Sequence, residues 1–210
     1  DFSVELMKQA LKGDPGKNVL LSPLSVLNAL AMTAHGADGE TLRQLESVFG
    51  LPVEELSKYL AAYLATMPSG EKYRFHTANS LWLREGIKVN RDFLQKNADY
   101  FGADIFQKSF DKSTLEEINQ WVNDNTQGMI PSILNEIRAE DILFLINALS
   151  FEAEWAKPYD EYNVFKQVFT HEDGTDETVD MMCSSETYYL KDENGVGFLK
   201  DYADSAYAFA

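Results

Sequence analysis

The sequence predicts an α+β fold in which helices come first along the chain and strands follow. Up to about residue 125, apolar side chains recur three and four positions apart, the spacing of helices that bury one face. Residues 142–155 instead begin with a nearly continuous apolar run, as expected for a strand covered on both faces. Residues 165–209 are β-prone and divided by turn dipeptides such as Asn194-Gly195. Helices followed by strands are typical of α+β architectures with a mixed sheet.

Length and charge restrict the class of protein and its partners. The chain has 210 residues, and no linker or repeat divides it, so we expect a single domain over residues 1–210. Its 18 basic and 34 acidic residues give a formal charge of −16. Such a charge repels phosphate groups, which argues against nucleic acid and against an anionic membrane as partners.

Cysteine content and hydrophobicity bear on the compartment. Cys183 is the single cysteine, so no disulfide can form within the chain. This fits a secreted protein large enough to be stable without disulfides, or a protein of a reducing compartment. We expect an extracellular location, with the cytoplasm as the alternative. The longest apolar stretch, residues 19–34, is interrupted by Pro23 and Asn28 and is too short and too polar to span a bilayer.

The first helices flank a short β-prone segment. Residues 2–11 have amphipathic helical spacing, and residues 18–21 are β-prone. Ser22 is the expected N-cap of the next helix, because Pro23 suits a first helical turn. That helix, residues 24–34, is apolar nearly all round, so we expect it to lie inside the domain.

Two further helices follow a glycine-rich break. Thr41 and Gln44 have the spacing of a capping box and predict a helix over residues 41–49, which Gly50 ends. Residues 53–67 predict another helix. Its expected apolar face comprises Leu56, Tyr59, Leu60, Tyr63, Leu64 and Met67.

Strands and helices then alternate. Residues 75–83 and 103–110 have the pattern of strands, and residues 90–101 that of a helix between them. Ser113 and Glu116 have capping-box spacing and predict the start of one more amphipathic helix. Its expected buried face comprises Leu115, Ile118, Trp121 and Val122.

The apolar run over residues 142–155 contains one amide side chain, Asn147. This amide needs hydrogen-bond partners, because an unpaired buried polar group costs on the order of 1–3 kcal/mol. Residues 206–210 resemble a strand in progress, with aromatic residues two positions apart. A domain rarely ends inside such a strand, so we expect the native polypeptide to continue beyond Ala210.

No catalytic, metal or cofactor site is apparent. The three histidines and the cysteine lie in unrelated segments, without metal-ligand spacing or a nucleophile signature. They are His35, His76, His171 and Cys183. We therefore expect no enzyme activity, no metal and no cofactor. Lys58, Lys72 and Arg74 form no basic stripe, so polyanion binding is not expected either.

Four ordered segments resemble the serpin family. They are residues 18–45 (NVLLSPLSVLNALAMTAHGADGETLRQL, like strand 6B with helices B and C), residues 78–86 (ANSLWLREG, like strand 2A), residues 118–130 (INQWVNDNTQGMI, like helix F) and residues 145–160 (LINALSFEAEWAKPYD, like strand 3A and the segment after it). The resemblance implies the serpin fold, with helices A–F packed on a large, mostly antiparallel sheet A and parts of sheets B and C.

The resemblance also implies a mechanism. An inhibitory serpin offers an exposed reactive-centre loop to a serine or cysteine protease as a substrate. After attack, the cut loop inserts into sheet A beside strand 3A, here about residues 142–155, and the trapped acyl-enzyme is distorted. Ser22, Ser25 and Asn147 match the shutter, a polar cluster beneath the opening point of sheet A. Trp155 matches the breach, where insertion begins.

The family's strand 5A, hinge and reactive loop are not within these 210 residues. We therefore expect a domain that is incomplete at its C-terminal end, with two partners: the remaining C-terminal part of the serpin and a target protease. Two alternatives stay open. The protein is a non-inhibitory serpin that acts as a carrier or chaperone, or the chain is itself a truncated interaction fragment.

Overall fold

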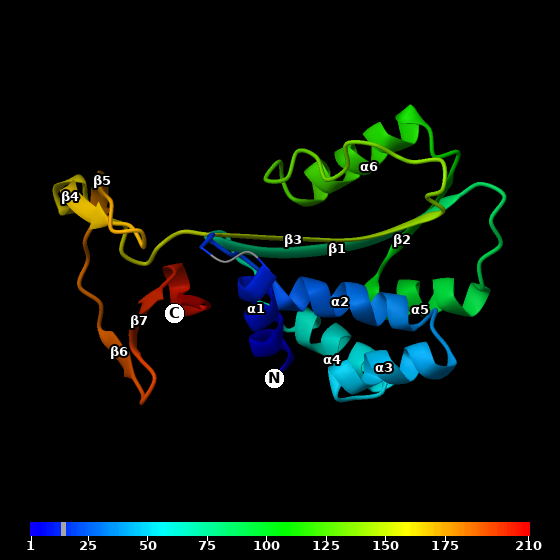
Figure 1. The fold of residues 1–210 in the computed structure, drawn as a ribbon, viewed down its shortest axis with the longest axis horizontal. Coiled ribbons are helices and arrows are strands. Elements are labelled where there is room, and N and C mark those ends of the chain that lie inside the picture. The colour runs from blue at the N-terminus through cyan, green and yellow to red at the C-terminus, as the bar shows by residue number, and fades with distance from the viewer. Residues whose placement is uncertain (14–15) are drawn as a thin grey trace. The chain divides into compact units, whose positions relative to one another are not determined.

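A computed structural model describes residues 1–13 and 16–210, and Figure 1 shows its elements. The α-helices are α1 Phe2–Gly13, α2 Pro23–Ala34, α3 Gly39–Phe49, α4 Val53–Ala65, α5 Arg91–Phe101 and α6 Lys112–Asn125. The strands are β1 Tyr73–Arg84, β2 Asp104–Lys108, β3 Leu143–Ala153, β4 Val164–Thr170, β5 Asp176–Met182, β6 Tyr188–Lys191, β7 Val196–Asp201 and β8 Ala208–Phe209. Short 3-10 helices lie at η1 Glu161–Asn163 and η2 Ala203–Ser205.

The chain forms two compact units. Unit 1 comprises residues 1–67 and 75–150, and unit 2 comprises residues 68–74 and 151–210. Strands β1 and β3 contribute residues to both units. The single domain expected over residues 1–210 stays a prediction.

The sheet of unit 1 is mixed, with strand order β2-β1-β3. β1 and β2 are parallel, with Ser80 opposite Asp104. β1 and β3 run antiparallel: Arg84 N donates to Ile142 O, whereas Glu154 N donates to Lys72 O near the other end of the pair.

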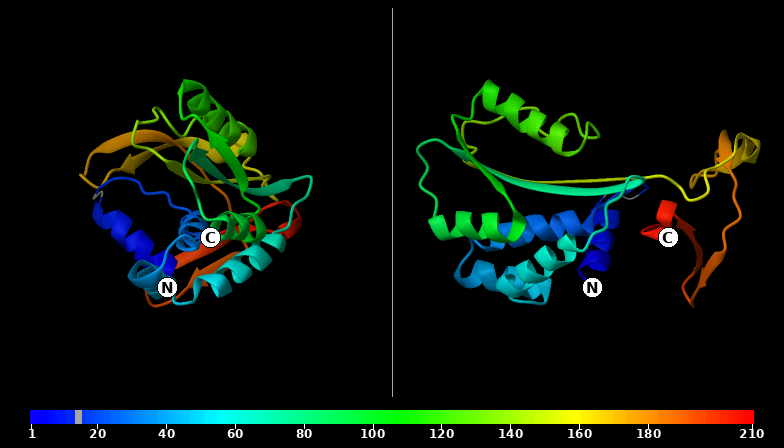
Figure 2. Two further views of the ribbon diagram at one scale, coloured as in Figure 1. Left: turned by 90° about the vertical axis from the view of Figure 1, so that its right-hand side faces the viewer. Right: turned by 180° about the vertical axis from the view of Figure 1, so that it is seen from behind.

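Helices cover both faces of this sheet, as Figures 1 and 2 show, with α6 on one side and α2, α4 and α5 on the other. Successive strand residues point to opposite faces. Leu81 accordingly packs in a core cluster with residues of α2, α4 and α5, whereas Trp82 packs in a second cluster with Ile118 of α6. Leu145 and Ile146 of β3 divide between the two clusters in the same way. The predicted strand covered on both faces is confirmed over the middle of β3.

Both predicted capping boxes were wrong. α3 begins at Gly39, two residues early, because the carboxylate of Asp38 accepts Gly39 N–H at 2.7 Å. α6 begins at Lys112, because Asp111 accepts Thr114 N–H at 3.1 Å. An aspartate just ahead of the helix satisfies a free N–H group of the first turn, so it sets the start. The stop at Gly50 is confirmed, with a left-handed φ of 75° that glycine adopts without strain.

Two other expectations fail for want of a packing partner. Residues 18–21 are not a strand, because no described segment pairs with them, and Leu20 is 97% exposed. In α4, Leu56 and Leu60 are buried, but Tyr59 and Tyr63 are more than half exposed. Helical spacing places these tyrosines on the apolar side of α4. The part of α4 that packs against the core is narrower than this apolar side, so the tyrosines stay exposed.

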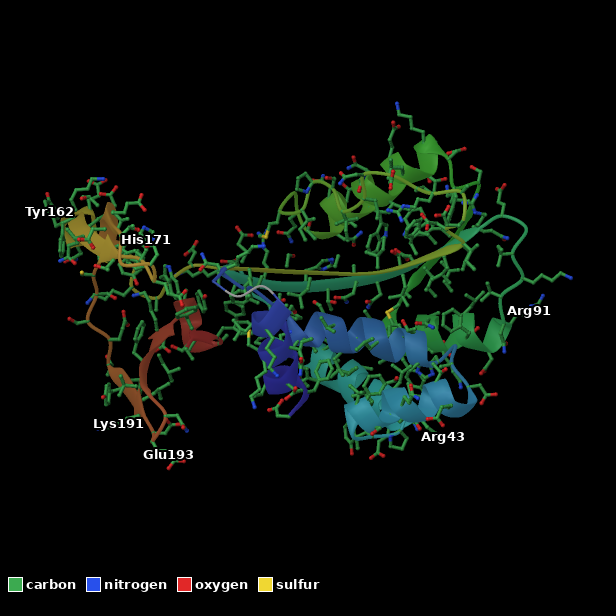
Figure 3. The ribbon with its side chains drawn as sticks, in the orientation of Figure 1. Arg43, Arg91, Tyr162, His171, Lys191 and Glu193 are labelled. Atoms are coloured by element: carbon green, nitrogen blue, oxygen red, sulfur yellow. The ribbon has the colours of Figure 1, made fainter. Side chains whose placement is uncertain are left out.

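Unit 2 is built of hairpins, which confirms the β-prone character predicted for residues 165–209. β4 and β5 pair antiparallel, with Val164 opposite Met182. β6, β7 and β8 form a second antiparallel sheet, in the order β6-β7-β8. Figure 3 labels exposed side chains of these hairpins: Tyr162 and His171 beside β4, and Lys191 and Glu193 beside the β6–β7 turn.

Candidate functional site

β3 is one of the two edge strands of the unit 1 sheet and, with 11 residues against 5 in β2, the longer of them. Within the described residues, β3 pairs only with β1, so its other backbone edge has no strand beside it. Edge N–H and C=O groups can bind a further strand by main-chain hydrogen bonds. β3 therefore has the geometry of an acceptor strand.

Ser22 and Ser25 meet at the start of α2. Ser22 Oγ lies 2.9 Å from Ser25 Oγ and also accepts the N–H of Ser25 at 3.3 Å. Ser22 is the N-cap of α2 and Pro23 occupies its first turn, as predicted. The hydroxyl pair therefore fixes the point at which the chain enters the most apolar helix of unit 1.

Asn147 belongs to a hydrogen-bonded chain of amides across the sheet. Its Nδ2 donates to Asn79 Oδ1 at 2.8 Å and lies 3.4 Å from Thr77 Oγ1. Asn79 Nδ2 donates in turn to the carbonyl of Phe101 at 2.8 Å. The chain joins β3 to β1 and then to the end of α5, so the expected partners of Asn147 exist on its donor side.

Three buried amides of unit 1 lack a hydrogen-bond partner on the acceptor side within the described part of the chain. The side-chain oxygens of Asn28, Asn97 and Asn147 are buried, without a hydrogen-bond partner among the described residues. Each such oxygen costs roughly 1–3 kcal/mol relative to a paired one. Unit 1 thus contains spare acceptors in its interior, which a rearrangement could satisfy.

The serines and the amide chain are separate networks. No hydrogen bond among the described residues joins Ser22 or Ser25 to Asn147. Their resemblance-based grouping as one shutter stays a prediction.

Trp155 lies in unit 2, where its ring is held by other side chains of that unit. Its indole stacks on Tyr202 at 4.4 Å between ring centroids and 9° between planes, and the two backbones form a β-bridge. The Lys200 ammonium lies 5.4 Å from the Trp155 ring and 4.4 Å from the Tyr159 ring. Such cation–π contacts are stronger where water is excluded.

The Lys200 side chain is only 3% exposed and is paired. Its Nζ lies 2.7 Å from Glu186 Oε1, and this hydrogen bond, aided by Ser184, lowers the pKa of the Glu186 carboxyl. Lys200 and Asn79 are site residues that the sequence reasoning missed. Asn79 was detectable by the argument used for Asn147, since it is an amide at the edge of an apolar run; Lys200 carries no such signal.

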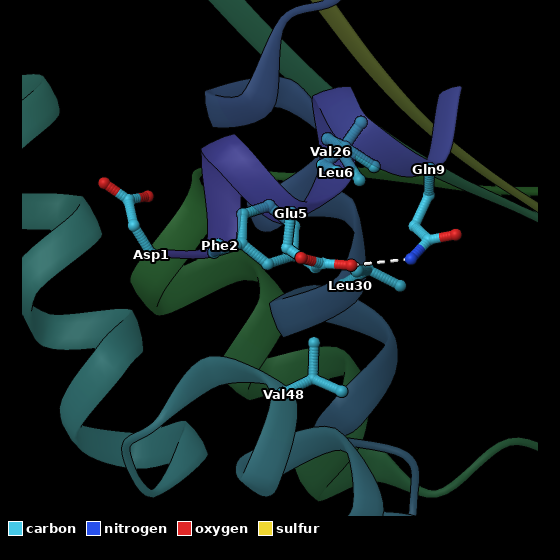
Figure 4. A pocket seen from close by; sticks show the side chains of 8 residues that line it. All are labelled: Asp1, Phe2, Glu5, Leu6, Gln9, Val26, Leu30 and Val48. Atoms are coloured by element: carbon cyan, nitrogen blue, oxygen red, sulfur yellow. Dashed lines mark hydrogen bonds between the residues drawn. The ribbon is translucent and has the colours of Figure 1, made fainter. Parts of the chain in front are cut away.

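An apolar cavity of 480 Å³ opens among α1, α2 and α3, and Figure 4 shows its lining. The lining residues are Asp1, Phe2, Glu5, Leu6, Gln9, Val26, Leu30 and Val48. Its carboxylates are engaged locally, because Glu5 accepts from Gln9 at 2.6 Å and Asp1 accepts Ser3 N–H at 2.9 Å. The cavity offers apolar surface and no nucleophile.

Neither a metal cluster nor a membrane-spanning helix occurs among the described residues. In that part of the chain, no group of three or more His, Cys, Asp or Glu side chains could hold a metal ion. None of the described helices combines the length and apolar character needed to cross a membrane.

Comparison with known proteins identifies the family. The family model described as Serpin (serine protease inhibitor) matches residues 1–200. This chain belongs to the serpin family. The order of helices and strands is therefore that of a partial serpin, and the α+β serpin fold is confirmed.

Among solved structures, the thermophilic serpin tengpin in the latent state is 47% identical, with a TM-score of 0.90 over 98% of this chain and 56% of tengpin. Serpin B9 of Homo sapiens is 30% identical over 196 residues, which are 90% of this chain and 52% of that serpin. Human thyroxine binding globulin is 24% identical with a TM-score of 0.87, a likeness of fold alone, over 100% of this chain and 66% of that chain. The serpin chain spans about half the length of the curated relatives it matches.

Proposed function

We propose that this serpin chain is the loop-receiving half of a protease inhibitor that traps a serine or cysteine protease. The observation that carries the proposal is β3 itself, a strand packed on both faces whose sequence resembles strand 3A, beside which an inserted reactive-centre loop would pair. The family supports the inhibitor class, and two matched relatives carry inhibitor names, plasminogen activator inhibitor 1 of Bos taurus and antichymotrypsin-2 of Bombyx mori.

The trapping step is an arrested acyl transfer. The protease nucleophile attacks the carbonyl of the reactive bond, the peptide bond breaks, and the new amine leaves with the proton from the nucleophile. An ester or thioester then links protease and serpin. Insertion of the freed loop beside β3 would add main-chain hydrogen bonds. The free energy gained by these bonds would drive insertion before water hydrolyses the acyl-enzyme.

The buried amides support a role in the opening of the sheet. Asn147 binds Asn79 through Nδ2 only, and its Oδ1 has no partner among the described residues. The bond from Asn147 to Asn79 joins β3 to β1 in the uninserted sheet, so the sheet would open more readily without it. Ser22 and Ser25 are proposed to act in the same shutter and Trp155 at the breach.

The test uses the complete polypeptide that contains this chain, incubated with proteases of trypsin-like, chymotrypsin-like, elastase-like and papain-like specificity. We expect an SDS-resistant band at the summed mass of serpin and protease. A protease whose nucleophilic Ser or Cys is replaced by Ala is the control and must give no such band. Cleaved serpin without any complex, for every protease tried, points to the carrier or chaperone alternative.

The interaction-fragment alternative makes a different prediction. If the chain acts alone, it stays monomeric and folded at working concentration, and no C-terminal serpin fragment binds it. Light scattering of the isolated chain, with and without that fragment, separates this outcome from the inhibitor proposal.

An extracellular location is also proposed, with the cytoplasm as the alternative, and secretion of the tagged protein tests it.

A further inference from the structure

His35 follows directly after α2 and inserts its ring among α4 and α5. Its side chain is 0% exposed. The imidazole stacks on the Tyr100 ring at 5.5 Å and 14°, and the Phe101 ring lies edge-on at 6.0 Å. A titratable ring thus lies between the end of α2 and helices α4 and α5, in a part of unit 1 that the proposed inhibitor mechanism does not use.

One ring nitrogen is hydrogen-bonded and the other is not. His35 Nε2 lies 2.8 Å from Ser57 Oγ, and the Ser57 hydroxyl donates to the carbonyl of Val53 at 2.8 Å. With the hydroxyl proton used in this way, Nε2 donates its own proton to Ser57 Oγ. Nδ1 then carries a lone pair, and it is buried without a hydrogen-bond partner among the described residues.

The Glu54 carboxylate faces the unpartnered nitrogen of His35, but this carboxylate already binds Lys96. Glu54 Oε1 lies 4.0 Å from His35 Nδ1, but the same oxygen binds Lys96 Nζ at 2.6 Å. Tyr100 OH donates to the other oxygen of Glu54 at 2.9 Å, and Asp92 lies 3.2 Å from Lys96. The charged and titratable groups that act on the ring are thus Glu54 of α4 and Lys96, Asp92 and Tyr100 of α5.

Protonation of Nδ1 would place a second cation beside the Lys96 ammonium, in a position closed to water. Burial disfavours the charged ring most strongly, Glu54 favours it and Lys96 disfavours it, so the pKa of His35 lies below its usual 6.5. The unfolded chain takes up this proton more readily than the folded chain.

We propose that His35 is an acid-sensitive junction, which loosens the end of α2 from α4 and α5 when a proton binds Nδ1. The geometry that carries this inference is the enclosed ring, the unpartnered nitrogen and the carboxylate already held by a lysine. The device regulates the stability of the helical layer of unit 1, and it does not depend on the proposed inhibitor function.

The sign of the effect follows from proton linkage. Since the folded-state pKa lies below the unfolded-state value, stability contributed by neutral His35 is complete above about pH 6.5 and falls as the pH drops toward the folded-state pKa. Carboxylates titrate near pH 4 in unfolded chains, so the interval from pH 7.5 to 5.5 isolates histidine effects.

Thermal unfolding of the chain between pH 7.5 and 5.5 tests the proposal. We expect the melting temperature of the unmutated chain to fall over this interval and that of His35→Gln to fall less, because glutamine keeps a donor for Ser57 and cannot titrate. His76→Gln, at an exposed position of β1, is the matched control and should keep the slope of the unmutated chain. An unchanged slope in His35→Gln overturns the proposal.

An NMR titration of the imidazole covers the case in which His35→Gln does not fold. The midpoint for His35 is expected below pH 6.5, lower still in Glu54→Gln and higher in Lys96→Met. An imidazole on which Glu54 and Lys96 do not act would show no such opposite shifts. A midpoint at or above 6.5, or one that neither variant moves, overturns the proposal.

Discussion

The two units of this serpin chain bury their apolar residues very differently. In unit 1, Trp82, Met32, Leu81 and Ile118 are almost completely buried between the sheet and its helices. In unit 2, large apolar side chains of the hairpins stay exposed, among them Val168, Phe169, Tyr189, Val196 and Phe198. Its buried residues, among those the structure describes, are Lys200 and Ala203.

The contrast follows from how each unit is assembled. Helices close both faces of the unit 1 sheet, so alternate strand residues have somewhere to pack. The hairpins of unit 2 pair their backbones, but few described side chains cover their faces. A sheet held mainly by main-chain hydrogen bonds is weakly stabilised, because apolar burial contributes most of the free energy of folding. Stability within this chain should therefore be concentrated in unit 1.

The largest predicted effect tests that contrast directly. Ile118→Ala truncates a side chain of α6 that has no exposed surface, and it should lower the free energy of unfolding by about 2–5 kcal/mol. Val168→Ala, at a 62% exposed position of β4, should change it by about 0.5 kcal/mol or less. Urea unfolding monitored by circular dichroism measures both. Equal losses would show that unit 2 contains a core of its own.

A second prediction concerns the one buried charge of unit 2 among the residues that the structure describes. Lys200→Ala removes the ion pair with Glu186 and the cation contacts to Trp155 and Tyr159, and should cost about 1–3 kcal/mol. Lys200→Met keeps the apolar stem and should cost less. The emission of Trp155 reports on this site, provided that Trp82 and Trp121 are replaced by Phe. If alanine and methionine behave alike, the charge rather than the packing sets the stability of unit 2.

The smallest predicted effect lies among the amides of unit 1. Asn147→Ala breaks the bond to Asn79 but also removes an unpaired buried oxygen, so the free energy of unfolding should change by only about 1 kcal/mol or less. Asn79→Ala leaves both Asn147 and the Phe101 carbonyl without that partner and should cost more. In the complete serpin, Asn147→Ala should lower the temperature at which loop insertion or polymerisation begins. An unchanged temperature removes Asn147 from the proposed shutter.

Local signals were sufficient to predict the family and, in their order, the six α-helices and the strands β1, β2 and β3. Helical spacing, the apolar run of β3 and the glycine stop at Gly50 can be recognised in sequence, since each follows from contacts between residues near one another in the chain. The N-cap role of Ser22 is of the same kind, because a cap bonds the helix that it precedes. The serpin resemblance also rested on contiguous segments, and the match over residues 1–200 agrees with it.

Features that depend on a partner from elsewhere in the chain became apparent only in the folded protein. Residues 18–21 have the composition of a strand, but a strand exists only where another backbone accepts its hydrogen bonds. Lys200 became a buried ion only because Glu186, Trp155 and Tyr159 surround it. Nothing in the sequence distinguishes His35 from the other histidines, whereas in the folded chain Ser57, Glu54 and Tyr100 surround its ring. Burial and pairing are properties of the folded chain. Here they lower the pKa of His35 and hold the Lys200 ammonium against Glu186.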